Sequence, residues 1–172
     1  MILPEVINNF NVYDGNNNKY IGVSGEVSLA DIDQTTAAIS GAGLLGELNI
    51  PVIGQLAAIE QVIPFNVLTV NLFSQFKLHK VATVVLRGDI QSTDTSTGEF
   101  KHEALRITLK GYVKKVSPGK VKAADSMGSS VTLELTYISI RINDQIMIKI
   151  DKLNSVYIVN GEDILADIKK NC

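Results

Sequence analysis

The sequence predicts a mainly β fold: an antiparallel β-sandwich or barrel with long hairpins and a short flanking C-terminal helix. Most segments alternate apolar and polar residues, which is the period of a half-buried strand. Clusters of Gly, Asn, Asp and Ser separate these segments and are typical of turns. The 172 residues, of which 45% are hydrophobic and 20% charged, suit one globular domain spanning residues 1–172.

The N-terminal third is predicted to hold three short strands. Two are expected over residues 9–13 and 19–23, around a turn at residues 14–18 whose Asp, Gly and Asn residues tolerate left-handed geometry. A third is expected over residues 25–32, where Val27 and Leu29 alternate with polar neighbours. Residues 1–8, before the first strand, are expected to form an N-terminal arm.

The middle of the chain predicts long strands. Residues 81–90 and 104–116 are expected to form a hairpin, and residues 130–143 a further strand. In that last strand the apolar positions change phase after Tyr137, which predicts a bulge or a change of partner strand. Asn143 and Asp144 are expected to make a tight turn into a strand over residues 145–150.

Helix is expected in two places only. Residues 162–171 begin with acidic residues and end with two lysines, which matches the helix dipole at both ends. A second short helix is expected around residues 67–75, after Pro64.

Residues 40–56 are unusual because they combine glycines and a proline with many large aliphatic side chains. The glycines predict an extended loop, yet a long apolar loop needs a partner surface. Burying six such side chains, at roughly 100 Å² each, against another molecule would gain on the order of 15 kcal/mol before association costs. We expect this loop to contact neighbouring molecules.

The sequence contains no convincing catalytic, cofactor-binding or metal-binding motif, so we expect neither an enzyme nor a cofactor or metal site. Residues 41–46 match the glycine spacing of a dinucleotide-binding turn, but the required strand and helix are not predicted around them. The two histidines and the single cysteine, Cys172, fit no metal or nucleophile pattern. No apolar run is long enough to predict a stable membrane segment.

Charge is segregated along the chain although the net charge is only −2. Residues 1–76 contain one basic and seven acidic residues, residues 77–122 ten basic and four acidic, and the remainder five basic and seven acidic. Opposite charge on two parts of one surface lets copies of a molecule attract each other head to tail. Candidate charge-complementary contacts are Asp31, Asp33, Glu47, Lys110, Lys114, Lys115, Lys120 and Lys122.

Both ends of the chain carry short family-like motifs. The chain begins with LPEVINNFNVY at residues 3–13 and YIG at residues 20–22, and it closes with IDKLN at residues 150–154 and YIVNGED at residues 157–163. Together with Arg87-Gly88, these resemble the major tail tube proteins of contractile-tail bacteriophages and of phage-tail-like (R-type) bacteriocins. Residues 39–62 depart from the usual sequence pattern of this family, because they are more apolar and richer in glycine than that pattern.

The resemblance implies a structural subunit that forms hexameric rings, which stack as a homo-polymer into the hollow inner tube of a contractile tail. The implied partners are the tail sheath protein, the tape measure protein and the baseplate or tail-terminator proteins, with non-specific passage of DNA or ions through the bore. The implied location is a virion tail or bacteriocin particle assembled in the bacterial cytoplasm. The sequence leaves open which of the two particles it is, and which strand face lines the bore.

The apolar arm and loop are then the expected subunit interface, and the nine residues concerned are Ile2, Leu3, Val6, Leu44, Leu45, Leu48, Ile50, Val52 and Ile53. The alternative reading is a monomeric β-sandwich that binds a carbohydrate or another small ligand. Such a module needs exposed aromatic platforms, whereas aromatic residues make up 6% of this chain and tryptophan is absent.

Overall fold

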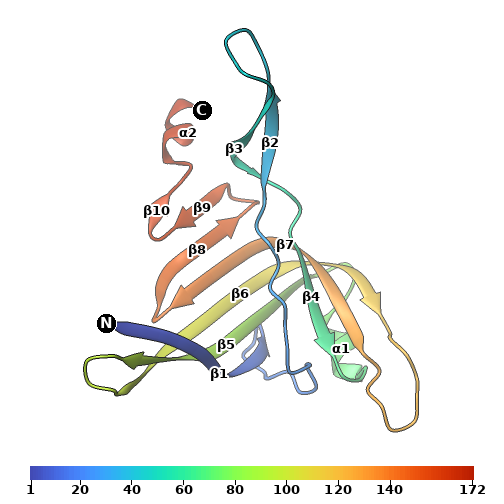
Figure 1. The fold of residues 1–172 in the computed structure, drawn as a ribbon. Helices are drawn as coiled ribbons and strands as arrows, with labels where there is room; N and C mark the ends of the chain where they lie inside the picture. Colours follow the sequence, from blue (N-terminus) through green and yellow to red (C-terminus); the bar gives the residue numbers. More distant parts are fainter.

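The protein folds into one large antiparallel sheet, one separate hairpin and two short helices (Figure 1). The computed structural model describes all residues from 1 to 172. In chain order the elements are β1 (Ile2–Asp14), β2 (Gln34–Ile39), β3 (Leu48–Leu56), β4 (Glu60–Phe65), α1 (Val70–Gln75), β5 (Val81–Asp94), β6 (Phe100–Ser117), β7 (Ser129–Ile142), β8 (Gln145–Asp151), β9 (Val156–Val159), β10 (Glu162–Asp163) and α2 (Ala166–Asn171). The predicted mainly β fold with long hairpins and a short C-terminal helix is confirmed.

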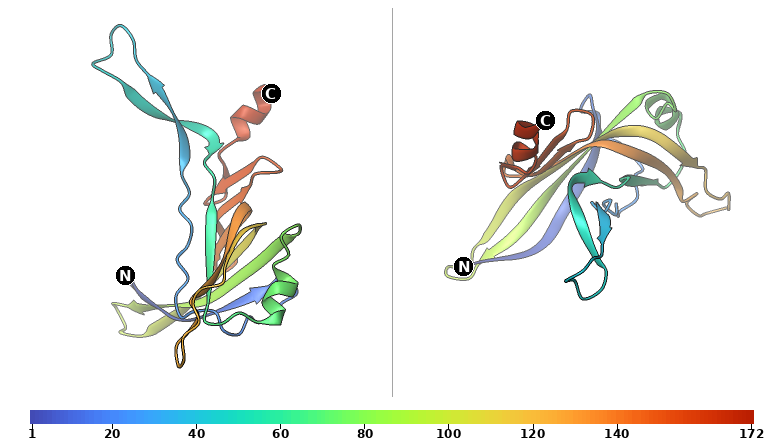
Figure 2. Two further views of the ribbon diagram at one scale, coloured as in Figure 1. Left: turned by 90° about the vertical axis from the view of Figure 1, so that its right-hand side faces the viewer. Right: turned by 90° about the horizontal axis from the view of Figure 1, so that it is seen from above.

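The large sheet has eight strands in the order β1-β5-β6-β7-β8-β9-β10, with β4 pairing beside the first half of β7. Strands β2 and β3 pair only with each other. Figures 1 and 2 show that this β2–β3 hairpin projects well clear of the sheet. One outer edge of the sheet is therefore β1, and no strand of the chain covers it.

The core lies on one face of the large sheet. Val84, Leu109, Ile138 and Ile150 stand directly opposite one another across β5, β6, β7 and β8, and all four are buried. Segment 23–32, β4 and α1 supply the side chains that pack against this face. The residues between these positions point to the other face, which we call the bare face, because strand side chains alternate.

The predicted irregularity near Tyr137 is confirmed. The register of β6 with β7 shifts there, since Lys110 faces Tyr137 while Gly111 faces Leu135. Thr136 is the extra residue, so the inward-facing set changes phase across it. β7 also changes partner at this point, pairing with β4 before the bulge and with β8 after it.

The N-terminal region differs from its prediction. Residues 2–14 form one continuous strand paired with β5, so residues 1–8 are not a separate arm. The expected strand over residues 19–23 is reduced to two isolated bridges, Tyr13 with Lys19 and Val23 with Phe65. The apolar residues Ile2 to Ile7 are ordered because their backbone pairs with the long β5 strand, a partner that local sequence does not reveal.

The strand predicted over residues 25–32 is wrong, since this segment pairs with no strand. Val27, Ala30 and Ile32 still pack against the core. The buried amide of Gln61 takes the place of a partner strand: its Nε2 donates to the carbonyl of Ser28 at 2.7 Å, and its Oε1 accepts from the amide of Ala30 at 3.0 Å. The Gln61 side chain thus bonds two backbone groups that the apolar–polar alternation of this segment had predicted to pair with a neighbouring strand.

The extended loop predicted over residues 40–56 is also wrong in its second half. Residues 48–56 form β3, which pairs with β2, and only residues 40–47 connect the two strands. Three of the four glycines that suggested a loop lie at positions of positive φ, in the connection at Gly43 and Gly46 and within β3 at Gly54. The β-branched residues between them therefore form a strand.

The C-terminal helix is shorter than predicted. Asn160 and Gly161, both with positive φ, form a tight turn that joins β9 to β10, so Glu162 and Asp163 are in a strand. The helix α2 begins only at Ala166, and α1 is confined to Val70–Gln75. The turn Asn143-Asp144 between β7 and β8 is confirmed, since both residues have positive φ.

Candidate assembly surfaces

The chain exposes far more surface than a compact monomer of its mass. A folded monomer of 18.6 kDa is expected to expose about 8,200 Å², whereas this chain exposes 10,993 Å². Only 25 of its 172 residues are buried. The excess of about a third is comparable with one chain's share of a large obligate interface.

All nine residues predicted as the subunit interface are exposed, and they lie in two separate places. Ile2, Leu3 and Val6 are on the first half of β1, where each is about half exposed. The other six belong to the β2–β3 hairpin or its connection, namely Leu44, Leu45, Leu48, Ile50, Val52 and Ile53. Figure 1 and the left panel of Figure 2 show the hairpin projecting away from the sheet that contains β1, so the two regions do not cover each other within one chain.

The first half of β1 is held firmly although it lies at an edge. Glu5 sits at a register shift, where its carboxylate accepts hydrogen bonds from Gln91 Nε2 at 2.9 Å and Thr93 Oγ1 at 2.6 Å. These two hydrogen bonds hold the pKa of Glu5 below its usual value. The exposed apolar side chains of β1 are therefore presented on an ordered strand.

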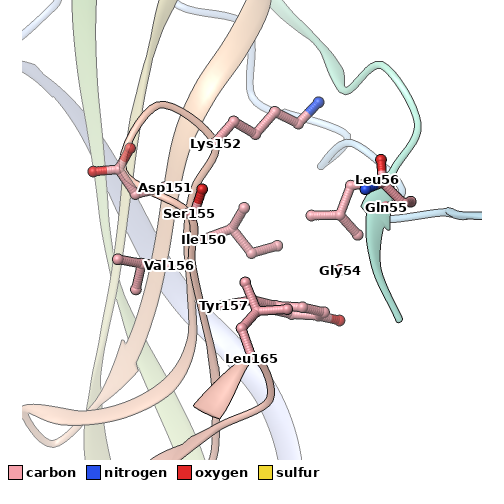
Figure 3. Close-up of a pocket in the computed structure, with 10 residues that line it drawn as sticks. All are labelled: Gly54, Gln55, Leu56, Ile150, Asp151, Lys152, Ser155, Val156, Tyr157 and Leu165. Carbon is pink, nitrogen blue, oxygen red and sulfur yellow. The ribbon is translucent and has the colours of Figure 1, made fainter. Parts of the chain in front are cut away.

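The root of the β2–β3 hairpin rests on the C-terminal part of the chain (Figure 3). Gly54, Ile150, Tyr157 and Leu165 line a shared cavity of about 230 Å³. A Cβ atom on Gly54 would lie only 2.6 Å from Leu165 Cδ2. Lys152 Nζ donates to the carbonyl of Ala57 at 2.8 Å, just beyond the end of β3. No sequence pattern joins these residues, so sequence reasoning missed this contact.

The predicted acidic contacts are free of partners within the chain. Asp31 lies on segment 23–32 and Asp33 directly after it, and Glu47 lies in the hairpin connection. All three are exposed, and none forms an ion pair. They remain candidates for contacts with another molecule.

Most of the predicted basic contacts, in contrast, already have partners in their own chain. Lys114 pairs with Glu60 and lies 3.7 Å from Glu134, and the hydrogen bond that Lys114 donates to Glu60 raises the pKa of Lys114. Lys120 and Lys122 both pair with Asp125, at 3.3 and 3.6 Å. Lys110 lies over the ring of Tyr137 at 5.1 Å, and Lys115 is exposed without an ion pair.

Nothing in the structure assembles a reactive centre. No group of three or more His, Cys, Asp or Glu side chains lies close enough together to hold a metal ion. His102 pairs with Asp89 at 2.8 Å on an exposed part of the sheet. Neither of the two six-residue helices is long and apolar enough to cross a membrane.

Comparison with known proteins agrees with these features. Residues 4–172 match the family model described as phage tail tube protein FII. The chain is also 23% identical over 169 residues to the major tail tube protein of Serratia phage KSP20, covering 97% of this chain and 94% of that protein. A non-enzymatic β subunit with large exposed apolar surfaces fits such a structural role, and the chain belongs to the phage tail tube protein FII family, whose members are structural components of the virion tail.

Proposed function

We propose that this protein forms hexameric rings that stack into the hollow inner tube of a contractile tail, a conduit for DNA or ions. The observation that carries the proposal is the exposed apolar hairpin, together with a surface about a third larger than that of a compact monomer. A chain with this much exposed apolar surface needs copies of itself to cover it.

The large sheet supplies the ring contacts in this proposal. The outer edge of β1 has unpaired backbone groups and carries Ile2, Leu3 and Val6. Free edges of this kind pair readily with another chain. Six sheets joined edge to edge would close into a ring with no free edge left.

The β2–β3 hairpin supplies the stacking contacts. It projects beyond the body of the subunit, with Leu44 and Leu45 at its tip. A projecting element that docks on a different surface of the next copy makes a heterologous contact, and such contacts generate filaments when they do not close. Rings stacked in this way form a tube of indefinite length.

The tube would meet the tail sheath protein on its outside, the tape measure protein inside, and the baseplate and tail-terminator proteins at its ends. These partners follow from the family, as does assembly in the bacterial cytoplasm. Both a DNA-filled phage tail and an empty bacteriocin particle are compatible with the subunit.

The test shortens the hairpin without touching the sheet. Ala37 and Ile50 are cross-strand partners, so residues 38–49 can be replaced by Asn-Gly, a two-residue turn suited to hairpins. No residue of β2 or β3 is buried, so we expect an unchanged circular dichroism spectrum. Negative-stain electron microscopy is expected to show tubes of uniform bore for the natural chain and none for the variant.

A point variant and its matched control sharpen the test. Leu44→Ser with Leu45→Ser is expected to abolish tubes, whereas Val121→Ser with Leu153→Ser, which changes equally exposed apolar residues elsewhere, is expected to leave them intact. Tubes that persist after hairpin shortening would refute the stacking role. A compact monomer from the natural chain, at every concentration and salt, would instead favour the alternative of a monomeric ligand-binding module.

A further inference from the structure

Three arginines form a row across the bare face of the large sheet. Arg87 on β5 is the direct cross-strand partner of Arg106 on β6, and Arg106 is the direct partner of Arg141 on β7. Their chain neighbours Leu86 and Ile107 are buried in the core, so the arginine side chains point to the opposite face. We call these three residues the arginine row.

Two of the three guanidinium groups have no partner in the chain. Arg87 donates to Asn17 Oδ1 and lies over the ring of Tyr13 at 4.5 Å. Neither Arg106 nor Arg141 forms a side-chain hydrogen bond or an ion pair with any residue. The row is therefore a positive surface that the subunit itself does not neutralise.

Such a row is unfavourable in an isolated sheet. Like charges at directly opposite strand positions repel each other and destabilise the pair. The guanidinium group is also the side chain best suited to binding carboxylates through two parallel hydrogen bonds. An anionic group that lies against the row would relieve this repulsion.

The chain carries a complementary set of carboxylates on its other side. Asp31 and Asp33 flank Ile32, which packs against the core, and both are exposed without an ion pair. This segment covers the core face of the sheet, whereas the arginine row is on the bare face. Because the sheet lies between them, the two groups cannot meet within one chain.

A second copy is a better partner for the row than a nucleic acid. The net charge of the chain is −2 and its first 76 residues are strongly acidic, which opposes the approach of a polyanion. Copies of the chain, in contrast, always bring one set of Asp31 and Asp33 for each arginine row. Complementary groups on opposite faces also make a contact that can propagate from copy to copy.

We propose that the arginine row binds the Asp31–Asp33 carboxylates of a neighbouring copy, with Arg106 and Arg141 as the pairing residues. This inference rests on the proposed tube, and it places the positive side of the contact between copies on the large sheet. The arginine row thus takes the role expected from the sequence for Lys114, Lys120 and Lys122, which are paired within their own chain.

Charge reversal tests the contact. The first variant carries Arg106→Glu and Arg141→Glu, the second Asp31→Lys and Asp33→Lys, and the third carries all four changes. Each of the first two is expected to raise the critical concentration for assembly, measured by sedimentation, by about tenfold or more, because exposed pairs each contribute up to about fivefold. The third variant, and an equal mixture of the first two, are expected to assemble within about threefold of the natural chain.

The matched control is Lys77→Glu with Lys80→Glu, which reverses two exposed lysines outside any ion pair and is expected to leave assembly unchanged. Circular dichroism checks that every variant is folded, and Arg106→Gln with Arg141→Gln provides a milder pair of changes. Natural assembly by the first two variants, or no recovery in the third, would overturn the proposal. So would loss of DNA binding in the first variant while its tubes persist. Failure of the natural chain to form tubes would instead refute the proposed function.

Discussion

Gly111 is a position where the backbone leaves no room for a side chain. It lies at the bulge where β7 changes partner, and a Cβ atom there would be 2.2 Å from the carbonyl oxygen of Glu134. The same atom would be 2.8 Å from the carbonyl carbon of Glu134 and 2.9 Å from Leu135 Cα. All three contacts are with backbone, so no side-chain rotation relieves them.

We therefore expect Gly111→Ala to destabilise the fold strongly. Restoring ordinary van der Waals separation requires β6 and β7 to move apart by about 1 Å, next to the buried Leu133 and Leu135. Overpacking of this kind costs about 3 kcal/mol, a large fraction of the total stability of a domain. For a chain of this length the melting temperature is expected to fall by roughly 6–12 °C.

Thermal and urea unfolding of the unassembled chain, followed by circular dichroism, measure this loss. The control is Gly25→Ala, since Gly25 has no positive φ and no atom lies within 4 Å of its added Cβ. We expect the control to change the free energy of unfolding by about 0.5 kcal/mol or less. A Gly111→Ala loss below about 1 kcal/mol would show that the bulge is pliable and that the reasoning is wrong.

Two further predictions concern the hairpin root and acid stability. In Gly54→Ala, the added Cβ collides with the flexible end of Leu165, and residue 54 must keep a positive φ. We therefore expect the free energy of unfolding to fall by about 1–2 kcal/mol and tube assembly to be slower. Adding Leu165→Ala to this variant should recover part of the assembly rate, and no recovery would contradict the contact at the hairpin root. Burial raises the pKa of Asp14, but hydrogen bonds from Asn18 and Asn16 outweigh this effect and hold the pKa below the ordinary value of 3.8. The ionised Asp14 carboxylate therefore stabilises the fold fully above pH 3.8, and this stabilisation is lost as the pH falls through the lower folded-state pKa. Urea unfolding at a series of pH values should show Asp14→Asn less stable than the natural chain at pH 7 and converging with it only as the pH falls below 3.8, through the folded-state pKa; a constant difference would contradict this.

Local sequence predicted strands β5 to β8 well, but not the short strands β9 and β10 that follow them. Strands β5 to β8 were predicted because each buries one face, which imposes a strict alternation on Leu105, Ile107 and Leu109. Even the bulge at Thr136 was visible, because one extra residue inverts that alternation. The exposure of the apolar residues on the candidate assembly surfaces was also predicted, since a large aliphatic side chain in a glycine-rich or terminal segment has no place in the core.

The first third of the fold was predicted poorly because its structure depends on distant partners. Residues 2–8 are a strand only because β5 extends to Asp94 beside them. Residues 25–32 pair with no strand, and the side chain of one glutamine, Gln61, bonds the carbonyl of Ser28 and the amide of Ala30 instead. Neither partner is adjacent in the chain, so neither leaves a local signal.

The sequence by itself determined that this is a β-rich structural subunit without a reactive centre, and that its charge is divided between two parts of the chain. Only the tertiary structure decided which charges are available. Lys114, Lys120 and Lys122 form ion pairs within the chain, while strand register brings Arg87, Arg106 and Arg141 into one row. Register is a property of two strands together, and for that reason no single stretch of sequence contains it.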